Sequence, residues 1–425
     1  MSNAWVIKGA RPMGGKATDL YVDNGELVDS EPSGAQVLDA DGLVALPGLV
    51  DLHTHLREPG REDAETVDTG SLAAALGGFT AVHAMANTEP VADVAGVVEQ
   101  VWRLGQESGH CDVRPVGAVT VGLKGEHLAE LGAMADSAAR VRVFSDDGKC
   151  VHDPVLMRRA LEYVKAFDGV IAQHAQDPAL TDGAQMNEGV QSARLGLAGW
   201  PAVAEEAVIA RDCLLAGHVG SRVHFCHVST AGSVEIVRWA KRKGWNVTAE
   251  VTPHHLLLTD AVVSTYDPVY KVNPPLRTSE DVHALREALA DGTIDAVATD
   301  HAPHALEDKE TEWSAAAFGM TGLETALSVV AAAMVETGLL DWEGVADRMS
   351  VRPARIGRLT GHGQPLVAGA PANVVLVDPA ARWVVDPRQS ASRSRNTPYA
   401  GRELPGRVVA TFLRGRPTIL DGKPA

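Results

Sequence analysis

Residues 44–60 read VALPGLVDLHTHLREPG, and this stretch sets the organisation of the whole chain. The run over 44–50 is apolar, as is typical of a buried strand, and it leads into His53 and His55. Side chains two residues apart on a strand share a face, so the two imidazoles should point the same way. Arg57 follows on the loop just above them. The sequence therefore places polar, reactive side chains at the end of a buried strand.

The same pattern continues along the middle of the chain, where short apolar runs alternate with longer amphipathic stretches. The runs predicted as strands are 49–55, 80–85, 113–119, 140–147, 169–175, 222–228, 246–253 and 294–303. The predicted helices between them include 65–78, 154–167, 201–217, 231–244 and 279–292. Eight strand–helix units in sequence favour an α/β fold of the (β/α)8 TIM-barrel type over a doubly wound sheet.

The two ends of the chain differ from its middle. Residues 1–48 and 362–425 contain short alternating runs separated by turns, and we predict that together they form one small β-sandwich-like domain. Residues 49–361 then form the barrel, which we expect to be a metal-dependent hydrolase.

Composition excludes several classes of function. The net charge is −17, from 55 acidic and 38 basic residues, which argues against binding to nucleic acid or to an anionic membrane surface. The four cysteines form no CxxC pair, and no signal-peptide pattern or long apolar run is present. We therefore expect a cytoplasmic protein that acts on a small molecule.

Residues that bind metals gather at the predicted strand ends. In addition to the first histidine pair, they are Asp146, Asp147, His174, His227 and Asp300. The C-terminal strand ends of a barrel form one face, and active sites lie there. Imidazole and carboxylate together suit zinc and related divalent ions. With one of the two adjacent aspartates counted, six ligands exceed the needs of one catalytic zinc, whereas two ions that share a bridging carboxylate would use them all.

Several longer stretches resemble the signature blocks of one family, the class I dihydroorotases of the amidohydrolase superfamily. They include DLHTHLREPG, GGFTAVHAMANTEP, FSDDGK, HVSTAGSV, YKVNPPLRTSEDVHAL and DGTIDAVATDHAPHALEDKE, and the similarity covers nearly the whole chain. The resemblance implies an enzyme of de novo pyrimidine biosynthesis that reversibly cyclises N-carbamoyl-L-aspartate to (S)-dihydroorotate and water.

The resemblance also implies a set of ligands for two zinc ions per chain. These ligands are His53, His55, Asp147, His174, His227 and Asp300. Asp147 would bridge the two ions, although Asp146 beside it remains the alternative bridge. Asp300 would also be catalytic, because its free oxygen could take the proton of the attacking water and pass it to the leaving ring nitrogen.

The implied substrate site centres on a carboxylate. A planar guanidinium binds a carboxylate through two parallel hydrogen bonds, which suits Arg57, although a salt bridge with Glu58 or Glu62 is the simpler interpretation. The full set of implied substrate contacts is His55, Arg57, Asn87, Asn273, His304, Phe318 and Gly319. Cys226 neighbours His227, so strand alternation predicts that it faces away from the metals.

Two alternative functions stay open. The first is another cyclic amidohydrolase, such as an allantoinase, hydantoinase or dihydropyrimidinase; these mostly use a bridging lysine, whereas Asp147 and Arg57 favour the dihydroorotases. The second is an inactive scaffold that supports aspartate transcarbamoylase, which the complete ligand set argues against. As partners, the resemblance suggests a second copy of the chain in a homodimer, and aspartate transcarbamoylase.

Overall fold

Eight short parallel strands form the closed ring at the centre of the computed structural model, which describes residues 4–425. In chain order they are β6 (Leu49–Thr54), β7 (Phe79–Ala84), β8 (Asp112–Pro115), β9 (Val143–Phe144), β10 (Val170–Gln173), β13 (Val223–Phe225), β14 (Val247–Val251) and β15 (Ala296–Val297). Parallel bridges join Gly117 to Phe144 and Thr54 to His301, and these two contacts close the ring. The (β/α)8 barrel is confirmed, with strands shorter than predicted.

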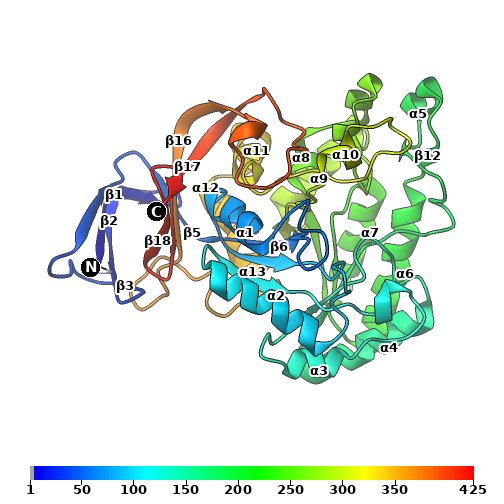
Figure 1. Ribbon diagram of the computed structural model, residues 1–425, viewed down its shortest axis with the longest axis horizontal. Coiled ribbons are helices and arrows are strands. Elements are labelled where there is room, and N and C mark those ends of the chain that lie inside the picture. The colour runs from blue at the N-terminus through cyan, green and yellow to red at the C-terminus, as the bar shows by residue number, and fades with distance from the viewer. Residues whose placement is uncertain (1–3) are drawn as a thin grey trace.

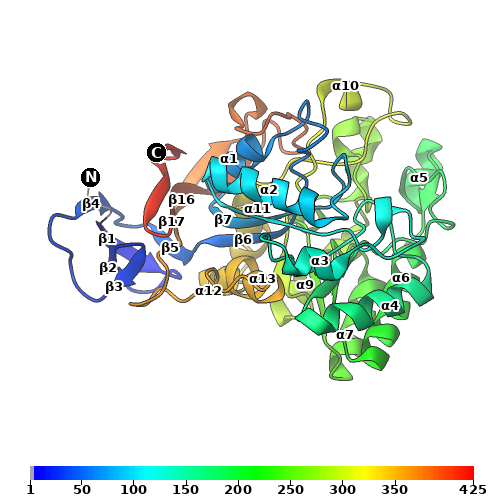
Figure 2. The same cartoon turned by 60° about the horizontal axis from the view of Figure 1, so that its bottom comes forward.

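Helices cover the outside of the barrel (Figures 1 and 2). The main ones are α1 (Val67–Leu76), α2 (Ala95–Ser108), α3 (Leu131–Asp136), α4 (Pro154–Val164), α6 (Val203–Val219), α7 (Ala231–Arg242) and α9 (Ser279–Asp291). Local sequence fixes their bounds. At the start of α9, Thr278 and Asp281 form a reciprocal capping box, and Gly292 ends the helix with a φ of 86°. Asp153 caps α4, whose first residue is Pro154.

Both ends of the chain contribute to one mixed sheet beside the barrel. The early strands are β1 (Trp5–Pro12), β2 (Thr18–Asp23), β3 (Glu26–Val28), β4 (Gln36–Asp39) and β5 (Val44–Pro47), and the late ones are β16 (Val374–Val384), β17 (Glu403–Leu413), β18 (Arg416–Leu420) and β19 (Lys423–Pro424). The strand order is β19-β18-β17-β16-β5-β1-β2-β3, with β4 on β1. Strand β5 thus joins the early and the late strands, and β1 and β19, the strands nearest the two ends of the chain, both lie in this sheet (Figure 1).

The N-terminal end of the barrel is closed by the segment that leads back to this sheet. Helix α12 (Trp342–Ala346) lies against β5, and α13 (Arg352–Ile356) lies against β6 (Figure 2). Ile356 packs on Leu52 inside the barrel. The opposite, C-terminal end of the barrel carries the loops on which the predicted site lies. Among residues 4–425, none of the helices has the length and hydrophobicity of a transmembrane span.

Candidate metal centre and substrate pocket

All six predicted metal ligands lie together at the C-terminal ends of the barrel strands. Strand β6 carries His53 and leads into His55, and β9, β10, β13 and β15 are followed by Asp147, His174, His227 and Asp300. All six are buried. The barrel brings together ligands that are far apart in the sequence, because its parallel strands all end on one face.

Asp147 is the centre of this cluster. Its Oδ1 lies 3.3 Å from His53 Nε2, 3.3 Å from His174 Nδ1 and 3.4 Å from His227 Nε2. Its Oδ2 lies 3.3 Å from His55 Nε2. One carboxylate therefore faces all four histidines, which is the arrangement that a bridge between two cations needs.

Asp146 forms its hydrogen bonds with a neighbouring loop and not with the histidine cluster. Its Oδ1 accepts hydrogen bonds from the backbone N–H groups of Val119 (2.8 Å) and Thr120 (2.9 Å), and its Oδ2 accepts one from the Thr120 hydroxyl. These bonds tie the loop after β9 to the loop after β8, and they leave Asp146 no free oxygen for the histidine cluster.

The orientation of His53 depends on a buried glutamate in β14. His53 Nδ1 donates to Glu250 Oε1 at 3.0 Å, and His224 Nε2 donates to Glu250 Oε2 at 2.9 Å. Burial raises the pKa of Glu250, but His224 and His53 outweigh this effect and lower it to about 2. The ionised carboxylate holds the Nδ1 proton of His53, so Nε2 presents its lone pair to the cluster.

Two other ligands are oriented by amides. His55 Nδ1 donates to Asn87 Oδ1 at 2.9 Å, and His174 Nε2 donates to Gln176 Oε1 at 2.6 Å. The same oxygen of Gln176 accepts a bond from Asn273 Nδ2 at 3.0 Å. Each hydrogen bond fixes one tautomer, so the opposite ring nitrogen can face the cluster.

These donors fit divalent cations. His174 Nδ1 and His227 Nε2 face each other at 2.9 Å, and His53 Nε2 is buried without a hydrogen-bond partner. Burial lowers the pKa of His53, but Asp147 and Asp300 outweigh it and raise that pKa well above its usual value. The ionised carboxylates thus favour a positive charge at this buried site, either as a ring proton or as a bound cation, and zinc takes this mixture of imidazole and carboxylate.

A pocket of about 240 Å³ opens onto the cluster. Five of the six ligands line it, and His53 lies beneath them. Every predicted substrate contact lines it as well: His55, Arg57, Asn87, Asn273, His304, Phe318 and Gly319. Gly148 and Ala302, which the sequence did not single out, complete the wall. The loops after seven strands thus enclose one space beside the predicted metal ligands.

Arg57 presents a free guanidinium to this pocket. Its Nε donates to the backbone carbonyl of Pro303 at 3.0 Å, and its two terminal nitrogens make no hydrogen bond or ion pair within residues 4–425. The salt bridge with Glu58 or Glu62 that sequence alone allowed is not formed. Burial lowers the pKa of Arg57 to about 10, although Asp300 acts in the opposite direction, so the guanidinium stays charged near neutral pH.

His304 holds the loop that carries Phe318. Its Nε2 donates to the Phe318 carbonyl at 2.8 Å, and burial, followed by Arg57 and Lys309, lowers the pKa of His304 to about 3. The ring is therefore neutral, and its one proton is already used. On the same loop, Lys309 Nζ donates to the carbonyls of Ala317 (2.8 Å) and Gly319 (3.0 Å). The pocket wall at 317–319 is thus fixed by two buried side chains.

The backbone is strained at three residues of the site. Arg57, His227 and Asp300 have φ values of 60°, 32° and 47°. Residues other than glycine rarely adopt this left-handed region, and such strain persists where the surrounding structure imposes it, commonly at functional sites. It turns these side chains away from the directions that regular strands would give them.

Cys226 is a correction to the sequence prediction. It does not face away from the metal ligands, since its Sγ lies within 4.8 Å of ligand atoms of His53 and Glu250. Strand β13 ends at Phe225, and the positive φ of His227 breaks the alternation on which the prediction rested. The thiol packs in the barrel interior below the cluster, and burial raises its pKa to about 12.

Sequence reasoning also missed Glu250, His224, Gln176 and Lys309. Glu250 had a usable signal, because it is a lone acid within an otherwise apolar and threonine-rich strand (NVTAEVTP, 246–253). Gln176 lies two residues after His174, where a strand end would bring it near the ligand. Lys309 had no such signal, because in the sequence a buried lysine in a charged loop cannot be distinguished from an exposed one.

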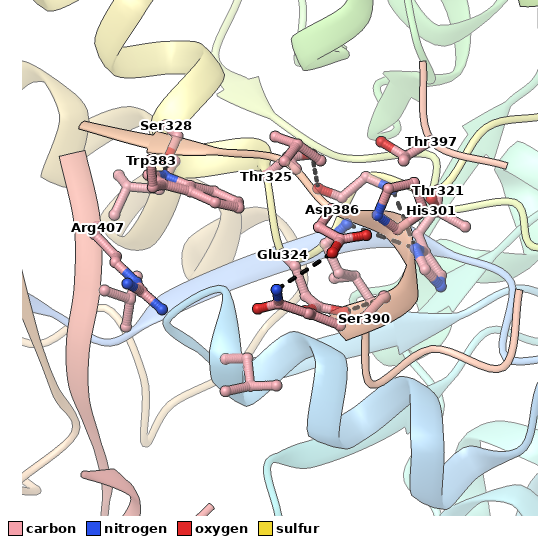
Figure 3. Close-up of a pocket in the computed structure, with 18 of the residues that line it drawn as sticks. His301, Thr321, Glu324, Thr325, Ser328, Trp383, Asp386, Ser390, Thr397 and Arg407 are labelled. Carbon is pink, nitrogen blue, oxygen red and sulfur yellow. Dashed lines mark hydrogen bonds between the residues drawn. The ribbon is translucent and has the colours of Figure 1, made fainter. Parts of the chain in front are cut away.

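A second cavity, of about 180 Å³, lies between the barrel and strands β16 and β17 (Figure 3). Its polar groups bond to one another: Glu324 accepts from the hydroxyl of Ser390, and Trp383 Nε1 donates to Ser328 Oγ at 3.0 Å. His301 borders this cavity with its ring bonded to Glu65 at 3.2 Å. The side chains that could react are thus already paired, and the metal ligands lie outside this cavity.

Comparison with known proteins gives a consistent result. A family model described as "Dihydro-orotase-like" matches residues 42–233. Dihydroorotases from Streptomyces coelicolor, Leifsonia xyli subsp. xyli and Mycobacterium tuberculosis are 73%, 67% and 58% identical to this chain, each over 98% of it and over 99%, 96% and 99% of their own lengths.

Solved structures of cyclic-amide hydrolases share the fold. An L-hydantoinase (dihydropyrimidinase) from Arthrobacter aurescens has a TM-score of 0.87 at 26% identity, covering 100% of this chain and 98% of its own. A dihydropyrimidinase from Brevibacillus agri has a TM-score of 0.83 at 21% identity, covering 100% of this chain and 96% of its own. The second likeness shows the fold alone.

Proposed function

The chain belongs to the dihydroorotase family, and from this membership we propose that it interconverts N-carbamoyl-L-aspartate and (S)-dihydroorotate in the pocket beside the histidine cluster. The observation that carries this assignment to the pocket is the pairing of two features. Asp147 faces four histidines, and the guanidinium of Arg57 is free in the same pocket. The first suits a metal-assisted hydrolase, and the second suits a ring that carries a carboxylate.

We propose that the cluster holds two zinc ions. One would be held by His53, His55 and Asp300, and the other by His174 and His227, with Asp147 shared between them. Its support is the position of Asp147 among all four rings and the hydrogen bonds that aim ring nitrogens at it. Two such cations supply electrophilic activation of the ring carbonyl and lower the pKa of a water molecule between them.

Asp300 handles the proton in this proposal. Its Oδ1 lies 3.1 Å from His55 Nε2 and 3.5 Å from His53 Nε2, and its Oδ2 makes no hydrogen bond within residues 4–425. Burial raises the pKa of Asp300, but His53 and His55 outweigh it and lower that pKa, so the carboxylate is ionised and can accept a proton. Oδ2 would take the proton of the attacking water and deliver it to the ring nitrogen as the C–N bond breaks.

Arg57 and Asn87 would bind the carboxylate of the substrate. Asn87 uses its carbonyl oxygen for His55, so its amide N–H groups are free to donate. Asn273 and the backbone at 318–319 would contact the amide edge of the ring. We assign His304 mainly to holding this backbone, because its single ring proton already bonds to the Phe318 carbonyl.

The alternative functions are not favoured. The hydantoinases share the fold, but as a class they mostly use a bridging lysine. The cluster in this chain contains no lysine, and Lys149, the lysine nearest to Asp147 in sequence, is exposed. An inactive scaffold is disfavoured because all six ligand positions are filled and brought together. We also propose, from the family resemblance, that the chain forms a homodimer and a complex with aspartate transcarbamoylase in the cytoplasm. Light scattering of the chain alone tests the homodimer, and light scattering of the chain mixed with that enzyme tests the complex.

The assay that tests the function is ring opening of (S)-dihydroorotate by the purified chain, with hydantoin, dihydrouracil and allantoin in parallel, with and without added zinc. We expect zinc-dependent turnover of dihydroorotate and much slower turnover of the neutral rings. Turnover of a neutral ring at a comparable rate would contradict the role of Arg57, and absence of turnover with two bound metals would contradict the assigned activity.

Zinc affinity should increase with pH. In the metal-free protein, burial lowers the pKa of His53 and His55, but the neighbouring carboxylates outweigh it and raise both values. A raised pKa keeps a ring protonated at higher pH, and zinc binds only the neutral ring, so each bound ion must displace protons. We expect apparent affinity to rise between about pH 6 and pH 8, measured by competition with a chromophoric chelator. An affinity that does not change with pH would argue against these ligands.

Glu250→Gln should weaken metal binding by about tenfold or more. Glutamine has one acceptor oxygen where Glu250 accepts from both His53 and His224, so one ring must change its tautomer. Glu287→Gln is the matched control, because Glu287 faces His283 at 3.2 Å on the protein surface. Zinc competition measures both variants, and equal affinities would contradict an orienting role for Glu250.

A further inference from the structure

A cavity of about 530 Å³ lies at the opposite end of the barrel from the predicted metal ligands. Asp112, which opens β8, and Asp168, just before β10, line it, as do residues 357–362, which follow α13. In a parallel barrel, the strand starts lie on the face away from the active site. Nothing in the proposed reaction uses this cavity.

The cavity concentrates positive charge in a chain whose net charge is −17. Its charged lining residues are Arg114, Arg140, Arg142, Arg358, Arg414 and the two aspartates. Each aspartate is already paired: Asp112 accepts from both terminal nitrogens of Arg414, at 2.6 Å and 3.0 Å, and Asp168 accepts from Arg358 at 2.6 Å. Three arginines therefore line the cavity with no carboxylate partner among residues 4–425.

Arg114 is the most unusual of the three. It lies in β8 opposite His83, and its side chain makes no hydrogen bond or ion pair within residues 4–425. Its Nε is shut off from solvent without a partner. A guanidinium stays charged under all physiological conditions, and a partly buried charge is costly unless a counter-charge accompanies it. The neighbouring His83 supplies no counter-charge. Burial and the charge of Arg114 lower the pKa of His83 to about 4, so its ring is neutral.

The two other arginines are placed to complete an anion site. Arg142 is held in position, because one of its terminal nitrogens donates to the carbonyls of Ala135 (2.9 Å) and Val141 (2.8 Å). Arg140 is exposed at the rim and makes no side-chain hydrogen bond or ion pair within residues 4–425. Arginine forks bind the oxygens of a phosphate group through paired hydrogen bonds.

We propose that this cavity binds a phosphate-bearing small molecule, with Arg114, Arg140 and Arg142 as the donors to the phosphate. The volume is larger than one phosphate group requires and is in the range of pockets that hold small organic ligands. Free phosphate and an organic phosphate would present the same phosphate oxygens to these three arginines. The volume of the cavity favours the organic phosphate.

Calorimetric titration of the full metal-loaded chain with inorganic phosphate and with ribose 5-phosphate tests this site. We expect one molecule bound per chain. Arg114→Gln should weaken binding by about tenfold or more, and Arg140→Gln by several-fold, because each removes charged hydrogen bonds. Arg103→Gln is the control, since Arg103 is an exposed surface arginine that faces Glu107 at 3.8 Å. Arg114→Lys, which keeps the charge, should retain part of the affinity.

The outcomes distinguish an organic phosphate from free phosphate, and they distinguish this cavity from the catalytic pocket as the binding site. Tighter binding of ribose 5-phosphate identifies an organic phosphate site, and equal affinities identify a free phosphate site; both support the proposal. Binding lost in Arg57→Gln but kept in Arg114→Gln would place the anion in the catalytic pocket and overturn it. No binding of either probe up to about 10 mM, which is weaker than ordinary ligand affinities, would also overturn it.

Discussion

Asp300→Asn is expected to lower kcat for ring opening of dihydroorotate by about 10³-fold, within the range that removal of a general acid–base group produces. Asparagine keeps the size of the side chain and one oxygen for His55, but its amide cannot accept and return a proton. The effect should appear in kcat more than in KM, since no substrate contact is assigned to Oδ2. Steady-state kinetics in both directions of the reaction measure it.

Metal analysis must accompany this experiment, because Asp300 is also a proposed ligand. If the variant keeps two metals and loses activity, the loss lies in proton transfer. Asp63→Asn is the control, because Asp63 is an exposed acid in the loop after β6, where it pairs with Arg61. A variant that retains its metals and near-normal kcat would remove Asp300 from the catalytic role.

Arg57→Gln is expected to reduce kcat/KM for dihydroorotate by about 100-fold, since paired charged hydrogen bonds to the substrate carboxylate contribute about 1.5–3 kcal/mol each. The loss should appear mainly as a higher KM. The defining readout is selectivity. Dihydrouracil lacks the carboxylate, so its slow turnover should change little, and the preference for dihydroorotate should collapse.

Arg61→Gln is the matched control, because Arg61 lies four residues further along the same loop and pairs with Asp63 and Asp308 outside the pocket. We expect it to behave like the unchanged protein. A uniform loss on both substrates in Arg57→Gln would instead indicate that the side chain only supports the loop, through its bond to the Pro303 carbonyl.

The sequence alone determined the barrel and the residues that its mouth collects. Eight apolar runs separated by amphipathic stretches can bury their surfaces only as a parallel sheet covered by helices. Once His53 and His55 end the first strand, His174, His227 and Asp300 must share their face, because all strands of a parallel barrel point the same way. The candidate ligands followed from topology, without knowledge of any distance, and the family resemblance implied which of them would bind the two ions.

Only the tertiary structure decided how those residues are used. Asp146 and Asp147 are chemically identical neighbours, and contact with Thr120 withdraws one from the cluster while four rings surround the other. Cys226 was misplaced because a positive φ at His227 breaks strand alternation, and no local pattern announces such strain.

The same holds for the residues that orient the site and for the arginine cavity. Glu250 selects the tautomer of a histidine nearly two hundred positions away, and Arg114 of β8 lines the same cavity as Arg140, which lies outside the strands. Sequence patterns report the periodicity of one segment at a time, so they identify strands, helices and what stands at their ends. Hydrogen-bond partners, tautomers and unpaired charges depend on contacts between segments, and those exist only once the chain has folded.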